Sequence, residues 1–136
     1  MTDKQHYVII SLASNSGQEH ALATARRRLA ELLGKAAFTR AIWTAPVGSS
    51  CEGQYLNQPC EARYLNQLCE GVTSLSCETL NGLLKQIETD AGRTRNGDGI
   101  VALDLDVLQY DDRREHLRDW GRSYVKDLLS DLKGTF

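Results

Sequence analysis

The chain lacks the features that mark several common protein classes. Its 136 residues carry 16 Lys and Arg against 18 Asp and Glu, a net charge of −2, so no excess of positive charge favours a nucleic-acid partner. The apolar run at residues 7–12 is far too short for a membrane span or a signal-peptide core. These absences predict a cytoplasmic protein with neither a membrane nor a nucleic acid as its partner.

Close cysteine pairs are also missing. The four cysteines are nine, nine and eight residues apart, at Cys51, Cys60, Cys69 and Cys77. Without a C-x-x-C pair they match neither a zinc knuckle nor a redox motif, and we expect reduced thiols. The three histidines are scattered, at His6, His20 and His116, and are expected to be surface or structural residues.

The length and composition predict one globular domain. A chain of 136 residues is long enough for one hydrophobic core and too short for two ordinary domains. Its 41% hydrophobic and 25% charged residues are typical of a soluble globular protein. We therefore expect a single domain over residues 1–136.

An acidic pair stands in the strand-like segment of residues 101–108. Because strand side chains alternate, Leu103, Leu105 and Val107 can face a core while Asp104 and Asp106 share the opposite face, roughly 7 Å apart. Paired carboxylates suit Mg²⁺, which keeps waters and takes substrate phosphates as further ligands. The alternative interpretation is an edge strand with a solvated acidic face, since the motif is short.

The hydrophobic pattern predicts seven elements. Strands are expected at residues 7–12, 38–43, 64–75 and 101–108, and helices at residues 18–33, 77–91 and 119–132. Ser76 can cap the second helix, and Gly34 and Gly92 end the first two. The order is that of an α+β, ferredoxin-like βαββαβ sandwich, an antiparallel sheet with both helices on one face, plus a C-terminal helix. Its other face is then open to ligands.

A short tandem repeat lengthens the connection between the second and third strands. Residues 51–58 (CEGQYLNQ) recur as residues 60–67 (CEARYLNQ). Pro59 separates the first copy from any strand ladder, whereas the second copy runs directly into a strand-like segment. We therefore expect Tyr64 and Asn66 to lie at the sheet and the first copy to be an insertion.

Six short segments together resemble one family. They are residues 11–15 (SLASN), 43–48 (WTAPVG), 64–66 (YLN), 83–88 (LLKQIE), 92–95 (GRTR) and 102–108 (ALDLDVL). In this order they are similar to 6-hydroxymethyl-7,8-dihydropterin pyrophosphokinase of folate biosynthesis. The resemblance implies the ferredoxin-like fold and an ATP-dependent enzyme that transfers the β,γ-diphosphate of ATP to the hydroxymethyl oxygen of the pterin and releases AMP.

The resemblance also implies site residues. It assigns catalytic roles to Asp104, Asp106 and Arg93, with the two aspartates holding two Mg²⁺ ions. It assigns the pterin site to Thr44, Val47, Tyr64, Asn66 and Tyr124. It assigns ATP binding to Glu88, Arg95 and Arg122. The expected partners are small molecules, ATP and the pterin, and the expected oligomeric state is a monomer.

Two departures from the family bear most on its activity. Residues 96–101 (NGDGIV) stand where the family has a mobile Trp-Gly-Pro-Arg loop, and residues 115–120 (EHLRDW) replace its Pro-His motif. Trp120 or Arg118 is a candidate substitute for the missing lid arginine. Two alternatives therefore stay open: a divergent member that binds pterin or nucleotide with little turnover, and a ferredoxin-like module that binds a regulatory ligand.

The predicted last helix assigns different directions to its residues. Trp120 and Tyr124 are one turn apart, whereas Arg122 projects about 200° away from Trp120. We therefore expect Tyr124 to cover the pterin with Trp120 beside it, and Arg122 to reach towards the ATP phosphates.

Overall fold

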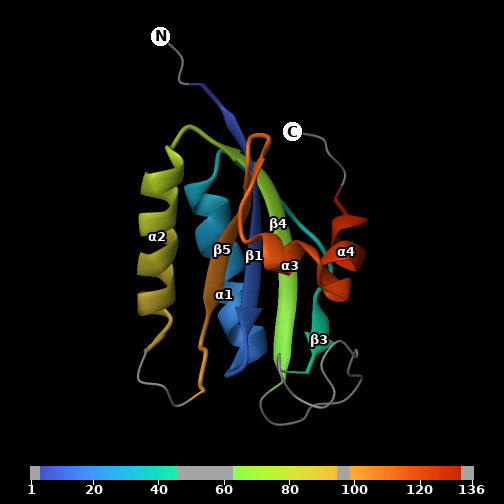
Figure 1. Ribbon diagram of the computed structural model, residues 1–136. Coiled ribbons are helices and arrows are strands. Elements are labelled where there is room, and N and C mark those ends of the chain that lie inside the picture. The colour runs from blue at the N-terminus through green and yellow to red at the C-terminus, as the bar shows by residue number, and fades with distance from the viewer. Residues whose placement is uncertain (1–3, 46–62, 95–98, 133–136) are drawn as a thin grey trace.

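The computed structural model describes residues 4–45, 63–94 and 99–132. Within them one antiparallel sheet has the order β2-β4-β1-β5-β6, with β3 also paired to β4 (Figure 1). Its strands are β1 His6–Ser14, β2 Lys35–Phe38, β3 Ile42–Thr44, β4 Tyr64–Thr73, β5 Asp104–Tyr110 and β6 Arg113–Arg114. The helices are α1 Gln18–Leu32, α2 Cys77–Asp90, α3 Leu117–Trp120 and α4 Ser123–Leu129. The predicted α+β, ferredoxin-like class is confirmed.

One face of the sheet is covered by the two long helices. On α1, Leu22 and Leu29 are fully buried, and on α2 Leu80 and Leu84 are buried at the same core. The N-cap of α2 is Ser76, whose hydroxyl accepts a hydrogen bond from the backbone N–H of Thr79, as expected. The apolar residues at helical spacing on α1 and α2 therefore pack on the sheet. There they contact the apolar residues that stand at alternate positions along each strand.

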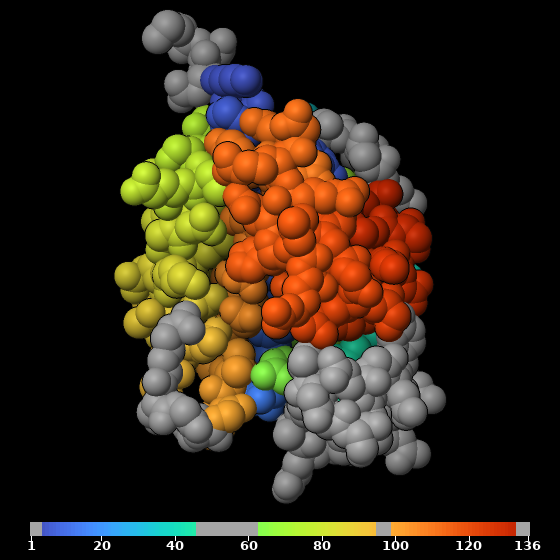
Figure 2. Space-filling view, viewed as in Figure 1, coloured from blue at the N-terminus to red at the C-terminus, as the bar shows by residue number. Residues whose placement is uncertain are grey.

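The opposite face carries a second, smaller core. It is formed by side chains of four strands and of α4: Ile9, Ile42, Leu68, Leu108, Val125 and Leu128. The short helices thus cover only part of this face. In Figure 2 the C-terminal segment, in orange and red, lies over the sheet, and parts of β1 and β4 are exposed below it.

The predicted strand at residues 38–43 is two shorter strands. Between β2 and β3, the side chain of Thr39 replaces a backbone acceptor of the strand pairing. Its Oγ1 accepts a hydrogen bond from the backbone N–H of Leu68 at 3.0 Å. The Thr39 N–H donates to the Leu68 carbonyl, and the Gln67 amide donates to the Thr39 carbonyl. A side chain that bonds the neighbouring backbone interrupts the regular pairing there.

The predicted helix at residues 119–132 is likewise two short helices. Gly121 ends α3, and Arg122, the N-cap of α4, has an extended backbone with φ −77° and ψ 139°. The indole N–H of Trp120 donates to the carbonyls of Leu108 and Glu115 and ties α3 to β5. The expectation that residues 120 and 124 stand one turn apart on the same helix is therefore wrong.

The second copy of the repeat forms the start of β4, so Tyr64 and Asn66 lie at the sheet as expected, whereas the first copy lies outside the described residues. Cys69 and Cys77 are free thiols. Among the helices that the structure describes, none is both long and apolar enough to cross a membrane.

Candidate functional site

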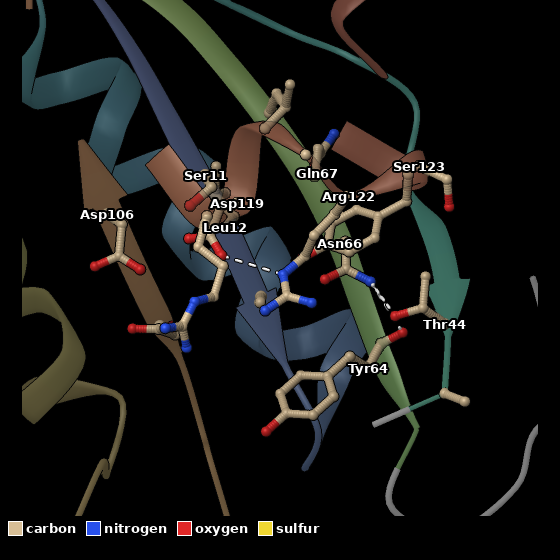
Figure 3. Close-up of a pocket in the computed structure, with 17 residues that line it drawn as sticks. Ser11, Leu12, Thr44, Tyr64, Asn66, Gln67, Asp106, Asp119, Arg122 and Ser123 are labelled. Carbon is tan, nitrogen blue, oxygen red and sulfur yellow. Dashed lines mark hydrogen bonds and ion pairs between the residues drawn. The ribbon is translucent and has the colours of Figure 1, made fainter. Parts of the chain in front are cut away.

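A cavity of about 580 Å³ lies on the part of the sheet that α4 leaves uncovered. It is lined from β1, β3, β4 and β5 and from residues 118–124. Figure 3 shows these side chains converging from the strands on one side and the C-terminal segment on the other. The cavity brings together seven of the predicted site residues: Thr44, Tyr64, Asn66, Asp104, Asp106, Arg122 and Tyr124.

The acidic pair lines this cavity from β5. Leu103, Leu105 and Val107 are buried in the main core, so the predicted alternation holds and both aspartates face the other side. Burial, followed by the charge of Asp104, raises the pKa of Asp106 to about 6. The ionised form of such a carboxyl group lacks a nearby positive charge that would stabilise it. A cation bound beside Asp106 would supply that charge.

Asp104 has its own cationic partner. The Arg93 Nη1 lies 3.2 Å from Asp104 Oδ1 and 3.8 Å from Glu88 Oε1, and it also donates to the Leu103 carbonyl. Glu88 is only 1% exposed on α2 and accepts a hydrogen bond from the Leu105 N–H. Neither Glu88 nor Arg93 is among the residues that line the cavity. The two residues instead connect α2 to the start of β5. The ion pair with Arg93 positions the Asp104 carboxylate from outside the cavity.

Asn66 is a buried amide at the cavity wall. Its Nδ2 donates to the Thr44 Oγ1 at 2.8 Å and to the Ile42 carbonyl at 3.2 Å, bonds that join β4 to β3. Among the described residues, none donates a hydrogen bond to its Oδ1. A buried amide oxygen without a donor is an acceptor available to a ligand that lies in the cavity.

Two tyrosines line the cavity from different elements, Tyr64 from β4 and Tyr124 from α4. The ring stack found among the described residues is His6 on Tyr110, so the two cavity tyrosines do not stack on each other. Burial, followed by the charge of Asp119, raises the pKa of Tyr124 to about 12, which keeps its hydroxyl neutral. Both tyrosines therefore offer aromatic surface to a bound ligand.

The α3 segment adds Asp119, which the sequence did not single out, and Arg118, which was named only as a candidate substitute for the missing lid arginine. Arg118 and Asp119 line the cavity, and Asp119 Oδ1 accepts a hydrogen bond from Arg122 Nε at 3.2 Å. The Arg118 side chain makes no hydrogen bond or ion pair with another described residue, although its backbone carbonyl accepts the Gly121 N–H. Its position could not be read from the sequence, because it depends on the break between α3 and α4. Trp120, the other candidate for the missing lid arginine, packs in the second core.

Asn15 fixes the segment that leads into β5. Its Oδ1 accepts from the Val101 N–H at 2.6 Å, and its Nδ2 donates to the Gly99 carbonyl at 2.8 Å. The end of β1 thus holds the chain just before the acidic strand. Two predicted site residues, Val47 and Arg95, lie outside the described residues.

Comparison with known families decides the assignment. The family model 7,8-dihydro-6-hydroxymethylpterin-pyrophosphokinase (HPPK) matches residues 9–134. The chain belongs to the HPPK family. Among individually curated proteins none matches, so this assignment rests on the family model. HPPK membership supports ATP binding and pyrophosphokinase activity in folate biosynthesis, and the matched range includes every residue that lines the cavity.

Proposed function

We propose that the protein transfers the β,γ-diphosphate of ATP to the hydroxymethyl group of 6-hydroxymethyl-7,8-dihydropterin in an Mg²⁺-dependent reaction. The hydroxymethyl oxygen attacks the β-phosphorus and loses its proton to solvent. The bond between this phosphorus and the α,β-bridging oxygen breaks, and AMP leaves with the electron pair. No protein nucleophile is needed, because the catalytic work is positioning and charge stabilisation.

The pterin is proposed to bind between Tyr64 and Tyr124. A flat heterocycle can pack against aromatic rings, a contact worth on the order of 1 kcal/mol beyond its burial. The Asn66 Oδ1, which has no donor among the described residues, would accept a hydrogen bond from a ring N–H. The cavity volume of about 580 Å³ is within the range of small-molecule sites. Thr44 orients the amide through its 2.8 Å hydrogen bond, and Val47 stays a predicted backbone contact.

The residues at the other side of the cavity fit a magnesium–nucleotide complex. Asp104 and Asp106 provide hard oxygen ligands on one strand face, and the raised pKa of Asp106 marks a carboxylate in need of a cation. Bound Mg²⁺ would polarise the phosphoryl group and neutralise charge on the leaving AMP. We propose two ions, as the family resemblance implies.

Three arginines are proposed to serve the phosphates in different ways. Arg118 and Arg122 line the cavity and would contact phosphate oxygens directly, a role that guanidinium groups suit. Arg93 would act through Asp104, which it positions by the 3.2 Å ion pair. Glu88 in turn forms an ion pair with Arg93 and accepts a hydrogen bond from the Leu105 N–H. Glu88 is therefore proposed as a positioning residue for the nucleotide side, and Arg95 stays a predicted ATP contact.

One observation carries the proposal: a single cavity holds the acidic pair beside two tyrosines and a buried amide acceptor. The direct test is to incubate the protein with 6-hydroxymethyl-7,8-dihydropterin, ATP and Mg²⁺ and to quantify AMP and the pterin diphosphate by chromatography. We expect equal amounts of both products and none when the pterin is left out or the metal is chelated.

The same assay separates the alternatives. Calorimetric binding of the pterin without AMP formation would overturn the proposed turnover and favour a divergent member that only binds its ligands. Binding of neither ATP nor the pterin would favour a regulatory module that shares only the fold.

A further inference from the structure

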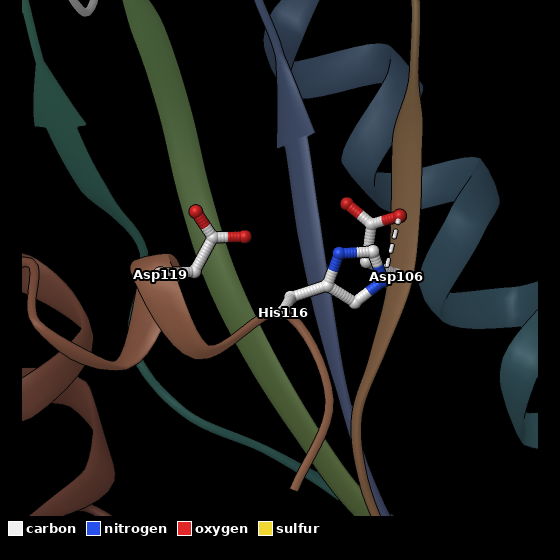
Figure 4. A group of neighbouring side chains, drawn as sticks. All are labelled: Asp106, His116 and Asp119. Atoms are coloured by element: carbon white, nitrogen blue, oxygen red, sulfur yellow. Dashed lines mark ion pairs between the residues drawn. The ribbon is translucent and has the colours of Figure 1, made fainter.

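Three potential metal ligands converge at the edge of the cavity. They are Asp106 on β5, His116 at the N-cap of α3 and Asp119 within α3 (Figure 4). One ligand atom from each residue lies within 4.8 Å of the others. From the sequence, His116 was expected to be a surface or structural residue. The hairpin turn between β5 and β6 returns the chain along β5 and so brings the His116 ring to the acidic strand.

The three side chains face one another with one long ion pair, between His116 and Asp106, and without a side-chain hydrogen bond among them. His116 Nε2 lies 3.7 Å from Asp106 Oδ1, which is too long for a hydrogen bond. Ions with metal–ligand distances of about 2.0–2.2 Å hold neighbouring ligand atoms roughly 3–4 Å apart. The 3.7 Å between His116 and Asp106 lies in this range, and because all three ligand atoms lie within 4.8 Å of one another, small side-chain rotations would bring them onto one cation.

A second His–Asp pair in the same protein provides the contrast. His6 Nδ1 lies 2.7 Å from Asp111 Oδ2, a full hydrogen bond, and the His6 ring stacks on Tyr110. That imidazole is already used by its protein neighbours. The His116 side chain is 47% exposed, and among the described residues its one ion-pair partner is Asp106, at a distance longer than a hydrogen bond.

The donor set points to the class of ion. Mg²⁺ strongly prefers oxygen ligands, whereas an imidazole nitrogen favours first-row transition metals, whose affinities for mixed nitrogen and oxygen sites exceed that of Mg²⁺. Two carboxylates and one neutral imidazole balance a divalent charge. Asp119 shares one oxygen with Arg122 at 3.2 Å, which leaves its second oxygen for a metal.

We propose that Asp106, His116 and Asp119 form a binding site for a divalent first-row transition-metal ion in the protein without nucleotide. The site goes beyond the proposed function and shares only Asp106 with the proposed magnesium pair. An ion held there takes Asp106 away from Mg²⁺, so that such an ion competes with the Mg²⁺-dependent step.

The test uses Mn²⁺ as the probe, because thiolates compete for it far less than for Zn²⁺. Electron paramagnetic resonance of free Mn²⁺ gives the affinity of the nucleotide-free protein, and Mg²⁺ is titrated in as a competitor. We expect one Mn²⁺ per chain and displacement only by a large excess of Mg²⁺. His116→Gln and Asp119→Asn should each weaken Mn²⁺ binding by about tenfold or more, whereas His116→Gln should change the Mg²⁺ affinity less than twofold.

His6→Gln is the matched control and should leave Mn²⁺ binding unchanged, since His6 bonds Asp111 at 2.7 Å. Unchanged Mn²⁺ affinity in both His116→Gln and Asp119→Asn, with circular dichroism showing folded proteins, would overturn the proposal. Equal losses of Mn²⁺ and Mg²⁺ affinity in His116→Gln would also overturn it, because they would show that the imidazole is not a ligand. Asp104→Asn separates the proposals: it should stop AMP formation while the preference for Mn²⁺ over Mg²⁺ remains.

Discussion

The sheet face opposite α1 and α2 has two halves, which are built from the same strands. One half stabilises the fold, and the other borders the cavity. Along β5 the outward residues change from Asp104 and Asp106 to Leu108, and along β1 they change from Ser11 to Ile9. The apolar half packs against α4, and the polar half borders the cavity. Where the strand residues are apolar, a helix covers them; where they are polar, the sheet is left accessible.

Physical chemistry accounts for this division. Covering Ile9 or Leu108 removes apolar surface from water and stabilises the fold. Covering Asp106 in the same way would bury a charge without a partner, which costs free energy. The polar half therefore contributes less to stability and is available to ligands, a pattern typical of functional sites.

The largest expected effect on stability concerns the apolar half. Leu128 is fully buried between α4 and the sheet, so Leu128→Ala should lower the free energy of unfolding by about 2–5 kcal/mol. Urea unfolding would measure this loss, with the exposed Leu117→Ala on α3 as control. A loss below about 1 kcal/mol would show that α4 is not part of the stabilising core.

The next effect concerns ligand binding in the polar half. Asn66→Ala should weaken pterin binding by about 1–3 kcal/mol, because a buried partner of the ligand is lost. Titration calorimetry would measure it, and Asn57→Ala in the first copy of the repeat should have little effect. A larger loss at Asn57 would mean that the first copy supplies the pterin contact.

Smaller effects are expected on the KM values, and they should differ between the two substrates. Tyr124→Ala should raise the KM for the pterin by about fivefold, which corresponds to the free energy of one aromatic contact. The KM for ATP should rise much less. Arg122→Ala should do the reverse, since its guanidinium is proposed to face phosphate. Steady-state kinetics with each substrate varied in turn would measure the split, and equal effects on both substrates would mean that this segment is only structural.

The structure shows why some elements were predictable and others were not. Alternation placed Asp104 and Asp106 opposite Leu105 correctly, because a strand repeats every two residues whatever surrounds it. The break at Arg122 was missed, since a helical pattern of apolar residues says nothing of a tertiary bond such as Trp120 Nε1 to the Leu108 carbonyl.

The candidate site follows the same rule. The residues carried by motifs on regular strands, such as Asn66, reach the cavity together because the strand order brings them there. Arg118 and His116 gain their positions from an irregular segment after β6, where long-range contacts decide the path of the chain. The pattern and the family resemblance together therefore predicted the sheet side of the cavity and, from its C-terminal wall, Arg122 and Tyr124, but not the places of Asp119 and His116.

The last effect is a pH-dependent gain in stability. Folding raises the pKa of Asp106 from 3.8 to about 6, so its ionised form destabilises the folded protein. The destabilisation is absent below pH 3.8, where the carboxyl is protonated in both states, and complete above about pH 6. In metal-free buffer Asp106→Asn should therefore stabilise the protein by about 1–2 kcal/mol at pH 7.5, and thermal unfolding should show the gain fading towards pH 4.

The most direct test of the division between the two halves measures AMP formation and thermal unfolding on the same Asp106→Asn protein. We predict that AMP formation at saturating Mg²⁺ is abolished while the metal-free unfolding temperature is equal to or above that of the wild type. Turnover near the wild-type rate, or a loss of stability at pH 7.5, would contradict it.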